Sequence, residues 1–180
     1  LNGRSSSLWQ AGDLDAAERD DVRALAIREA LGPKFLEQAA QTLSNIGSKR
    51  FARGDYEGAL EYHRRAVEYF RRALGPDTPE AAWSVGSIGF DLNALSRWAE
   101  ARVVILEAIS LLERSRGPQH SQVSAQLIPL ATVQVHQKDY EGALVTAKRI
   151  RDTRAATLVA DHPLQADAHE IGRASCRERV

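Results

Sequence analysis

The sequence predicts an all-α protein, an α-α superhelix in which antiparallel helix pairs stack as a right-handed solenoid. The first observation behind this prediction is an internal repeat: DYEGAL stands at residues 55–60 and again, unchanged, at 139–144. Midway between them, RWAEAR at 97–102 keeps an aromatic residue, Glu and Ala at matching places, so the period is 42 residues and the chain holds about four repeats. The second observation is that apolar residues recur at helical spacing, and the third is that no alternating pattern typical of strands occurs.

The second repeat, residues 43–80, shows how each repeat is expected to form two helices. Its apolar residues recur at spacings of three and four in two groups separated by a break, which places one apolar stripe on each helix. The first group is Leu43, Ile46, Gly47 and Phe51, and the second is Ala59, Leu60, His63, Ala66, Val67, Phe70 and Leu74. The small residues on both stripes would let the two helix backbones approach closely, as an antiparallel pair requires.

Turn residues predict where these helices begin and end. Gly54 suits the left-handed backbone that ends a helix, and Asp55 suits the cap of the next one. That next helix is expected to end before Gly75, and Thr78 followed by Pro79 indicates a new helix start. The same signals predict helices at residues 14–30, 36–52, 56–73, 79–94, 98–115, 121–136 and 140–158, with Pro129 expected to kink the sixth.

Composition excludes several classes of protein. The formal net charge is +0, with 24 basic and 24 acidic residues, so the sequence shows no basic surface for nucleic acid. No apolar run approaches the roughly 20 residues of a membrane-spanning helix, and no basic-then-apolar secretory signal opens the chain. Cys176 is the only cysteine, so no disulfide framework is expected. We therefore expect a cytoplasmic protein that binds neither nucleic acid nor membranes.

The repeat resembles the tetratricopeptide repeat. The residues that carry the resemblance are Leu43, Ile46, Gly47, Gly54, Tyr56, Ala59 and Ala66, then Val85, Ile88, Gly89, Trp98, Ala101 and Ala108, then Leu127, Leu130, Ala131, Tyr140 and Ala143. The 42-residue period and the LGPDTP linker are similar to the long repeats of kinesin light chains and of bacterial arrays with LGxDHP linkers. The resemblance implies one array over residues 1–169, with repeats at about 1–42, 43–84, 85–126 and 127–168.

Both ends of this array are expected to be cut within a repeat. Residues 1–10 correspond to the later part of a first helix, and residues 162–169 to the start of another. The last ten residues, IGRASCRERV at 171–180, resemble the translation of a short-read sequencing adaptor and have no helical periodicity. We therefore expect residues 170–180 to be a non-native tail and exclude them from the predicted fold.

The sequence contains no arrangement typical of an enzyme or of a metal site. Its histidines are scattered: His63, His120, His136, His162 and His169. His63 lies on the packed stripe of its helix, where a structural histidine is the ordinary interpretation. No HExxH, CxxC or glycine-rich phosphate loop occurs. We therefore expect no catalytic residue, no metal and no cofactor.

The first helix of each pair is expected to line an inner groove of the superhelix. Ten residues of these helices are expected to line that groove: Ser44, Asn45, Ser48, Phe51, Ser87, Phe90, Asn93, Thr132, Val135 and His136. Short polar groups beside aromatic rings suit an extended peptide, because amides can bond its backbone and Phe can bury one of its side chains. In kinesin-light-chain-like arrays an asparagine holds the peptide backbone. The resemblance gives this role to Asn45, whereas Ser87 and Pro129 stand at the corresponding places.

These observations favour a non-catalytic scaffold that binds a peptide or a partner domain in its groove, as a fragment of a larger bacterial signalling or regulatory protein. Two alternatives stay open. The array could be the regulatory or substrate-recruiting segment of a serine/threonine kinase, or it could be a structural spacer whose groove residues are only a tolerated surface. The packing residues that carry the resemblance do not distinguish these functions.

Overall fold

The computed structural model describes residue 5 and residues 13–161, and within this part of the chain it consists of helices joined by short turns. The α-helices are α2 (Leu14–Ala30), α3 (Leu36–Ala52), α4 (Tyr56–Leu74), α5 (Pro79–Ala94), α6 (Trp98–Arg116), α7 (Ser121–His136) and α8 (Tyr140–Asp161), and a short 3-10 helix, η1, spans Pro33–Phe35. The tail expected at 170–180 lies outside the described residues.

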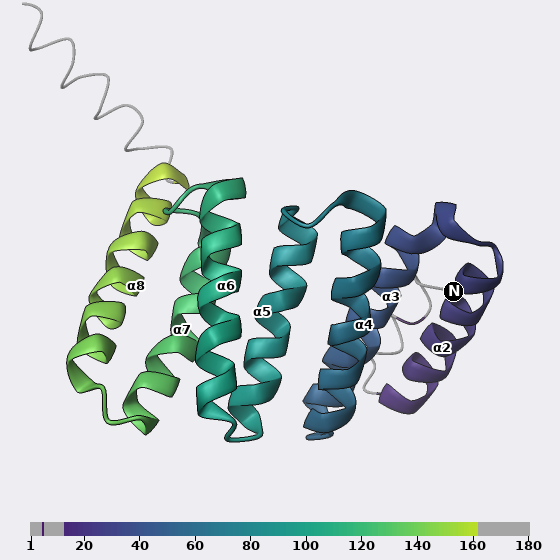
Figure 1. Cartoon of the computed structure of the whole chain (residues 1–180), viewed down its shortest axis with the longest axis horizontal. Coiled ribbons are helices and arrows are strands. Elements are labelled where there is room, and N and C mark those ends of the chain that lie inside the picture. The colour runs from purple at the N-terminus through teal and green to yellow at the C-terminus, as the bar shows by residue number, and fades with distance from the viewer. Residues whose placement is uncertain (1–4, 6–12, 162–180) are drawn as a thin grey trace, which may run out of the picture.

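The helices pair along the chain and the pairs stack in one row. Helix α3 packs on α4, α5 on α6 and α7 on α8, while α4 on α5 and α6 on α7 join successive pairs. The row runs from α2 at one end to α8 at the other, with neighbouring helices antiparallel (Figure 1). The all-α helical superhelix predicted from the 42-residue period is therefore confirmed.

The expected turn chemistry is present at the helix ends. Asp55 Oδ1 accepts a hydrogen bond from the backbone N–H of Gly58 at 3.0 Å, and Asp139 Oδ1 accepts the equivalent bond from Gly142 at 3.0 Å. Gly54 and Gly75 have φ of +82° and +102°, as predicted from their positions. Seven predicted helices are therefore confirmed: α4, α6 and α8 run one to three residues further than expected, and the other four end where predicted.

Helix α7 continues through Pro129, which is buried inside it. Proline removes one hydrogen bond from the helical ladder because it has no backbone N–H. The Pro129 carbonyl oxygen accepts a hydrogen bond from Asn93 Nδ2 on α5 at 3.4 Å. This bond links the Pro129 turn of α7 to α5 of the preceding pair.

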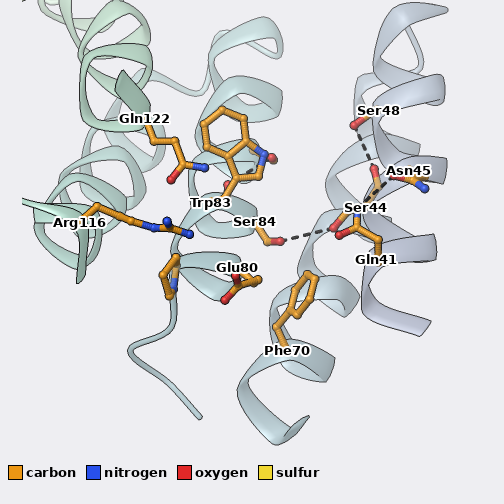
Figure 2. Close-up of a pocket in the computed structure, with 12 residues that line it drawn as sticks. Gln41, Ser44, Asn45, Ser48, Phe70, Glu80, Trp83, Ser84, Arg116 and Gln122 are labelled. Carbon is orange, nitrogen blue, oxygen red and sulfur yellow. Dashed lines mark hydrogen bonds between the residues drawn. The ribbon is translucent and has the colours of Figure 1, made fainter. Parts of the chain in front are cut away.

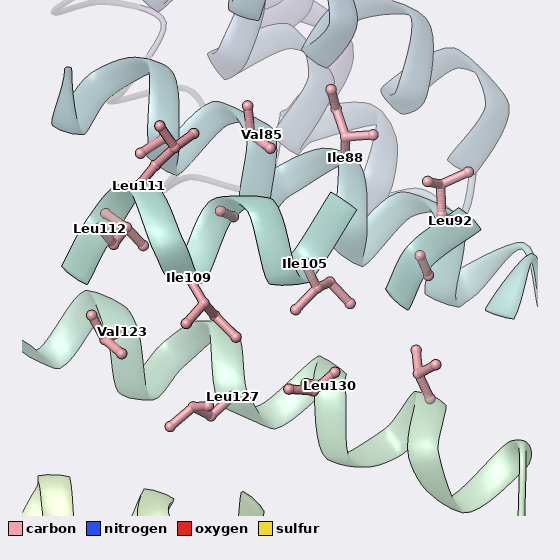
Figure 3. Packing of buried hydrophobic residues seen from close by; sticks show 14 of the residues in the cluster. Val85, Ile88, Leu92, Ile105, Ile109, Leu111, Leu112, Val123, Leu127 and Leu130 are labelled. Atoms are coloured by element: carbon pink, nitrogen blue, oxygen red, sulfur yellow. The ribbon is translucent and has the colours of Figure 1, made fainter. Parts of the chain in front are cut away.

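Small residues on the first helix of a pair make room for larger ones on the second. A Cβ atom added to Gly47 would lie 2.6 Å from His63 Nε2, and one added to Gly89 would lie 2.4 Å from Ile105 Cγ1. Ile105 belongs to the largest apolar cluster of the described chain, which runs from α4 to α7 (Figure 3). Close approach of the paired helices, expected from the small residues on both stripes, is therefore what the structure shows.

Candidate functional site

A pocket of about 320 Å³ opens across the first helices of successive pairs. Four of its lining residues come from α3, five from α5, and one each from α4, α6 and α7. The polar lining is made mostly of uncharged amides and hydroxyls: Gln41, Ser44, Asn45, Ser48, Ser84, Ser87 and Gln122. Figure 2 shows Trp83 and Arg116 on the α5 side of the pocket, facing Ser44 and Asn45 of α3 across it.

Hydrogen bonds within the lining position its polar groups. Gln41 Nε2 donates to Asn45 Oδ1 at 3.2 Å, and the amide nitrogen of Asn45 has no hydrogen-bond partner within the described part of the chain. Ser48 Oγ donates to the Ser44 carbonyl oxygen at 3.0 Å, and the hydroxyls of Ser44 and Ser84 lie 3.4 Å apart. The pocket can therefore offer a free amide donor to a ligand while its serines are largely satisfied within the protein.

The electrostatic character of the pocket is close to neutral. Only two charged residues line it, Glu80 and Arg116, and they have opposite signs. Trp83, which is 40 % exposed, is the large aromatic surface available to a ligand there. Such a lining suits a backbone or an uncharged polar side chain together with one apolar side chain, and it offers no concentrated charge for an anion or a cation.

The structure brings four of the ten predicted groove residues into this pocket. Ser44, Asn45, Ser48 and Ser87 all line it. The other six lie outside it. Three of these contact other residues of the protein. The ring centroids of Phe51 and Tyr56 lie 5.1 Å apart, Asn93 Nδ2 donates a hydrogen bond to the Pro129 carbonyl oxygen, and Thr132 Oγ1 donates to the Ile128 carbonyl oxygen at 3.3 Å.

The remaining three groove residues also lie away from the pocket. Phe90 is half-buried on α5, and Val135 is exposed near the end of α7. His136 stacks on Trp98, with ring centroids 4.0 Å apart and planes 5° from parallel. These residues stay candidates for a longer groove, but the described chain does not join them to the pocket.

Sequence reasoning missed the other eight lining residues, among them Gln41, Trp83, Arg116 and Gln122. A signal for the first two was present: Gln41 and Trp83 occupy the same repeat position, one helical turn before Asn45 and Ser87 respectively. Residues one turn apart share a helix face, so the groove prediction could have been extended by one turn. Arg116 and Gln122 reach the pocket from later helices, which spacing along one helix does not reveal.

Outside the pocket, the structure places His63 inside the protein. Its ring is 3 % exposed, and its Nδ1 lies 2.6 Å from Oδ2 of the fully buried Asp91 on the next helix pair. Burial raises the pKa of the Asp91 carboxyl, and the nearby His63 partly opposes this rise. Neither residue lines a described pocket, so this pair supports the packing role expected for His63.

Metal-binding clusters and membrane-spanning helices are both absent from the described residues. No three His, Cys, Asp or Glu residues in this part of the chain are grouped so that they could hold a metal ion. None of its helices combines the length and the apolar character that a crossing of the lipid bilayer requires.

Comparison with known families identifies the repeat. Two family models described as tetratricopeptide repeat match residues 38–102 and residues 1–36. Together they cover more than half of the chain, and the helix pairs, turns and small packing residues are those expected from the resemblance. The chain belongs to the tetratricopeptide-repeat family. No curated protein sequence matches it.

Solved structures share the fold. The crystal structure of BtubC (BKLC) from P. vanneervenii superposes with a TM-score of 0.78 at 22 % identity, over 90 % of this chain and 64 % of that one. The apo form of RapI gives a TM-score of 0.79 at 19 % identity, over 87 % of this chain and 55 % of that one. A Podosopora anserina protein with nearly identical TPR-like repeats, described as a kinesin light chain, gives 0.69 at 15 % identity, over 86 % and 73 %. The chain thus spans less than two thirds of BtubC and of RapI.

Proposed function

We propose that this array binds an extended peptide segment of a partner protein, with the pocket between α3 and α5 as the central contact. The observation that carries the proposal is the lining of that pocket: uncharged amides and hydroxyls surround one exposed aromatic ring, Trp83. An extended peptide presents backbone N–H and C=O groups at regular intervals and a side chain at every second residue on one side. The free Asn45 amide can donate a hydrogen bond to a peptide carbonyl group, and the Trp83 ring can pack against a peptide side chain.

The occupant that fits best is a peptide of low charge with an apolar or aromatic side chain. Because Glu80 and Arg116 balance each other, the pocket contributes little long-range attraction to an acidic or a basic segment. Binding is therefore expected to depend on backbone hydrogen bonds and on burial of one side chain against Trp83. It should change little when salt is raised through the physiological range.

A displayed library of random peptides tests this proposal while the natural partner is still unidentified. Peptides selected on the full chain should bind the wild type and lose about tenfold or more in affinity to Asn45→Ala and to Trp83→Ala, since each removes a central contact. The matched control is Val103→Ala, because Val103 is 67 % exposed on α6 and outside the pocket. Isothermal titration with each selected peptide provides the affinities.

The proposal fails if selected peptides bind both pocket variants as tightly as the wild type and the circular dichroism of the variants is unchanged. It also fails in its charge prediction if the selected peptides are consistently acidic and their affinity falls steeply with salt. A library that yields no binder at all, from a folded wild-type chain, supports the spacer alternative instead.

The proposal extends to the protein that contains the array. We infer that the array serves as the partner-binding part of a larger bacterial regulatory protein, and a kinase in the same chain is the alternative to a free-standing scaffold. The basis is that BtubC and RapI, which share the fold, are longer than this chain. Sequencing the parent gene outward from both ends tests this extension, because a catalytic domain or further 42-residue repeats would be read directly.

A further inference from the structure

Two repeat positions meet as a buried pair at the interfaces between successive helix pairs. One lies on the second helix of a pair and the other on the first helix of the next pair. At the first interface Asp21 of α2 pairs with Lys49 of α3, and both side chains are buried. At the second, His63 of α4 pairs with Asp91 of α5 at 2.6 Å. The members of each pair lie 28 residues apart, and the two pairs lie one 42-residue repeat apart. They are therefore the same structural contact made twice.

The chemistry of this contact changes from one interface to the next. The acidic group belongs to the earlier helix at the first interface and to the later helix at the second. One repeat further on, the corresponding residues are Ile105 and Val133, which are fully buried in one apolar cluster. Exchange of partners would place Asp21 against Asp91, two buried carboxylates, or either charge against Ile105 or Val133. Each mismatch leaves a buried charge without its counter-charge, which is among the costlier changes a protein interior can undergo.

The buried pairs form one ladder along the array, and a second ladder of ion pairs runs over the surface of the second helices. Its chemistry also changes from one interface to the next. Glu29 pairs with Arg65 at 3.0 Å, Arg71 with Glu107 at 2.7 Å, and Glu113 with Arg149. Each pair joins residues 36 apart, and successive pairs are again shifted by one repeat. The sign alternates along the ladder, acid to base, base to acid, acid to base. A shift by one repeat would therefore bring Glu29 against Glu107 and Arg71 against Arg149.

We propose that these two ladders specify the order in which the helix pairs stack. An array of similar repeats needs such a device, because the apolar stripes that drive stacking are shared and DYEGAL occurs unchanged in two repeats. Exposed ion pairs contribute little to stability, but like charges at a wrong contact add a penalty that a correct contact lacks. The partner that this pattern excludes is a helix pair out of order, from the same chain or from a second copy.

The test makes the second interface equivalent to the third while it keeps a matched pair at each one. His63→Ile with Asp91→Val copies the third buried pair into the second interface, and Ile at 63 has a precedent in Ile105 packed over Gly89. Arg71→Glu with Glu107→Arg gives all three surface pairs one polarity. Wild type and the fourfold variant are unfolded in guanidinium with reductant, refolded over a range of concentrations, and analysed by size-exclusion chromatography with light scattering.

The fourfold variant is expected to have a Tm within a few degrees of the wild type, yet to give a several-fold larger fraction of oligomers on refolding. Each double variant alone should give an intermediate increase, so a fourfold variant that does not fold leaves the test intact. The single variant His63→Ile should lower Tm by about 10 °C, because it leaves Asp91 buried without a partner.

The matched control reverses an ion pair that joins no two helix pairs. Glu68→Arg with Arg72→Glu inverts an exposed pair within α4 and carries the same number of substitutions as each double variant. It should leave the oligomer fraction at the wild-type level. An equal rise in this control, or a fourfold variant and both double variants that refold as cleanly as the wild type, overturns the proposal.

Discussion

Two non-glycine residues, Ser96 and Lys138, adopt a left-handed backbone with φ of 60° and 62°. Both stand at the repeat position of Gly54, directly after the first helix of a pair, where Gly54 has φ of +82°. A side chain at such φ costs roughly 1–2 kcal/mol, because its Cβ crowds the neighbouring carbonyl oxygen. The second, third and fourth repeats therefore make the same turn, but two of them make it with strain.

Glycine at these turns is expected to stabilise the array. Ser96→Gly and Lys138→Gly should each raise the free energy of unfolding by about 0.5–1 kcal/mol, since relief of the left-handed strain exceeds the extra entropy that glycine loses on folding. Urea unfolding followed by circular dichroism measures the change. Gly54→Ala is the reverse control and should lower the free energy of unfolding by about 1 kcal/mol. A loss of stability in both glycine variants would show that the turn gains more from the side chains than their strain costs.

Sequence reasoning at the residue scale predicts conformations better than partners. The left-handed turn at Gly54, the Asp55 cap and the packing role of His63 follow from local spacing. The partner of His63 does not, because Asp91 lies on the next helix pair and its polarity is specific to that interface. A pair of this kind becomes visible only when the repeats are aligned and the stacking geometry is known.

At the scale of elements, the contacts between first helices show how side-chain size is compensated across an interface. Between α3 and α5, the hydroxyls of Ser44 and Ser84 meet. Between α5 and α7 the corresponding residues are Gly86 and Gln126, and a Cβ added to Gly86 would lie 2.3 Å from Gln126 Nε2. The loss of one side chain thus makes room for a longer one opposite.

This compensation predicts the behaviour of three variants. Gly86→Ser should lower the free energy of unfolding by about 1–3 kcal/mol, because the new side chain overlaps the buried Gln126 amide. Gly86→Ser with Gln126→Ser recreates the contact made by Ser44 and Ser84, and it should recover most of the loss. Ser87→Ala, one residue further on the same helix, is the control and should change stability by less than about 0.5 kcal/mol. Thermal and urea unfolding measure these changes in stability. A Gly86→Ser variant as stable as the wild type, with no gain when Gln126→Ser is added, would contradict the close contact.

The helices themselves were predictable from the sequence, because their stripes, caps and glycine ends agree with one another. The short helix η1 was not predicted, since Gly32 and Pro33 indicate only a break between α2 and α3. The candidate site was predicted in part. Asn45 and its neighbours follow from one helix face, whereas the contributions of Arg116 and Gln122 depend on how α6 and α7 stack beside α5.

At the scale of the whole molecule, the apolar core is distributed unevenly along the row of helices. The largest cluster runs from α4 to α7, and smaller ones lie among α2, α3, α4 and the start of α5. The first interface also holds the charged Asp21–Lys49 pair. In a repeat array each helix pair is stabilised only by its neighbours. Local stability is therefore expected to be highest where apolar contacts continue on both sides.

The last described helix has one face that the described chain does not cover. Leu144 of α8 is 58 % exposed, whereas Leu60, two repeats earlier at the same position, is 2 % exposed. Leu60 is buried because α5 packs against α4, the helix that carries it. A helix that is packed on fewer sides opens at a lower free energy. The described part of the array should therefore open first at α8 rather than as one unit.

Amide hydrogen exchange on the full chain, read by mass spectrometry, tests this order of opening. Peptides from α5 and α6 are expected to exchange slowest and those from α8 fastest, since the middle helices are packed on both sides and one face of α8 is not covered by the described chain. Ile105→Ala should speed exchange throughout α4 to α7, because Ile105 is fully buried in the cluster that joins them. Leu25→Ala, in the smaller cluster at the other end, should speed exchange mainly in α2 and α3. Equal protection in all helices would instead mean that the array opens as a single cooperative unit. An Ile105→Ala effect confined to α6 would mean that the cluster does not couple its helices.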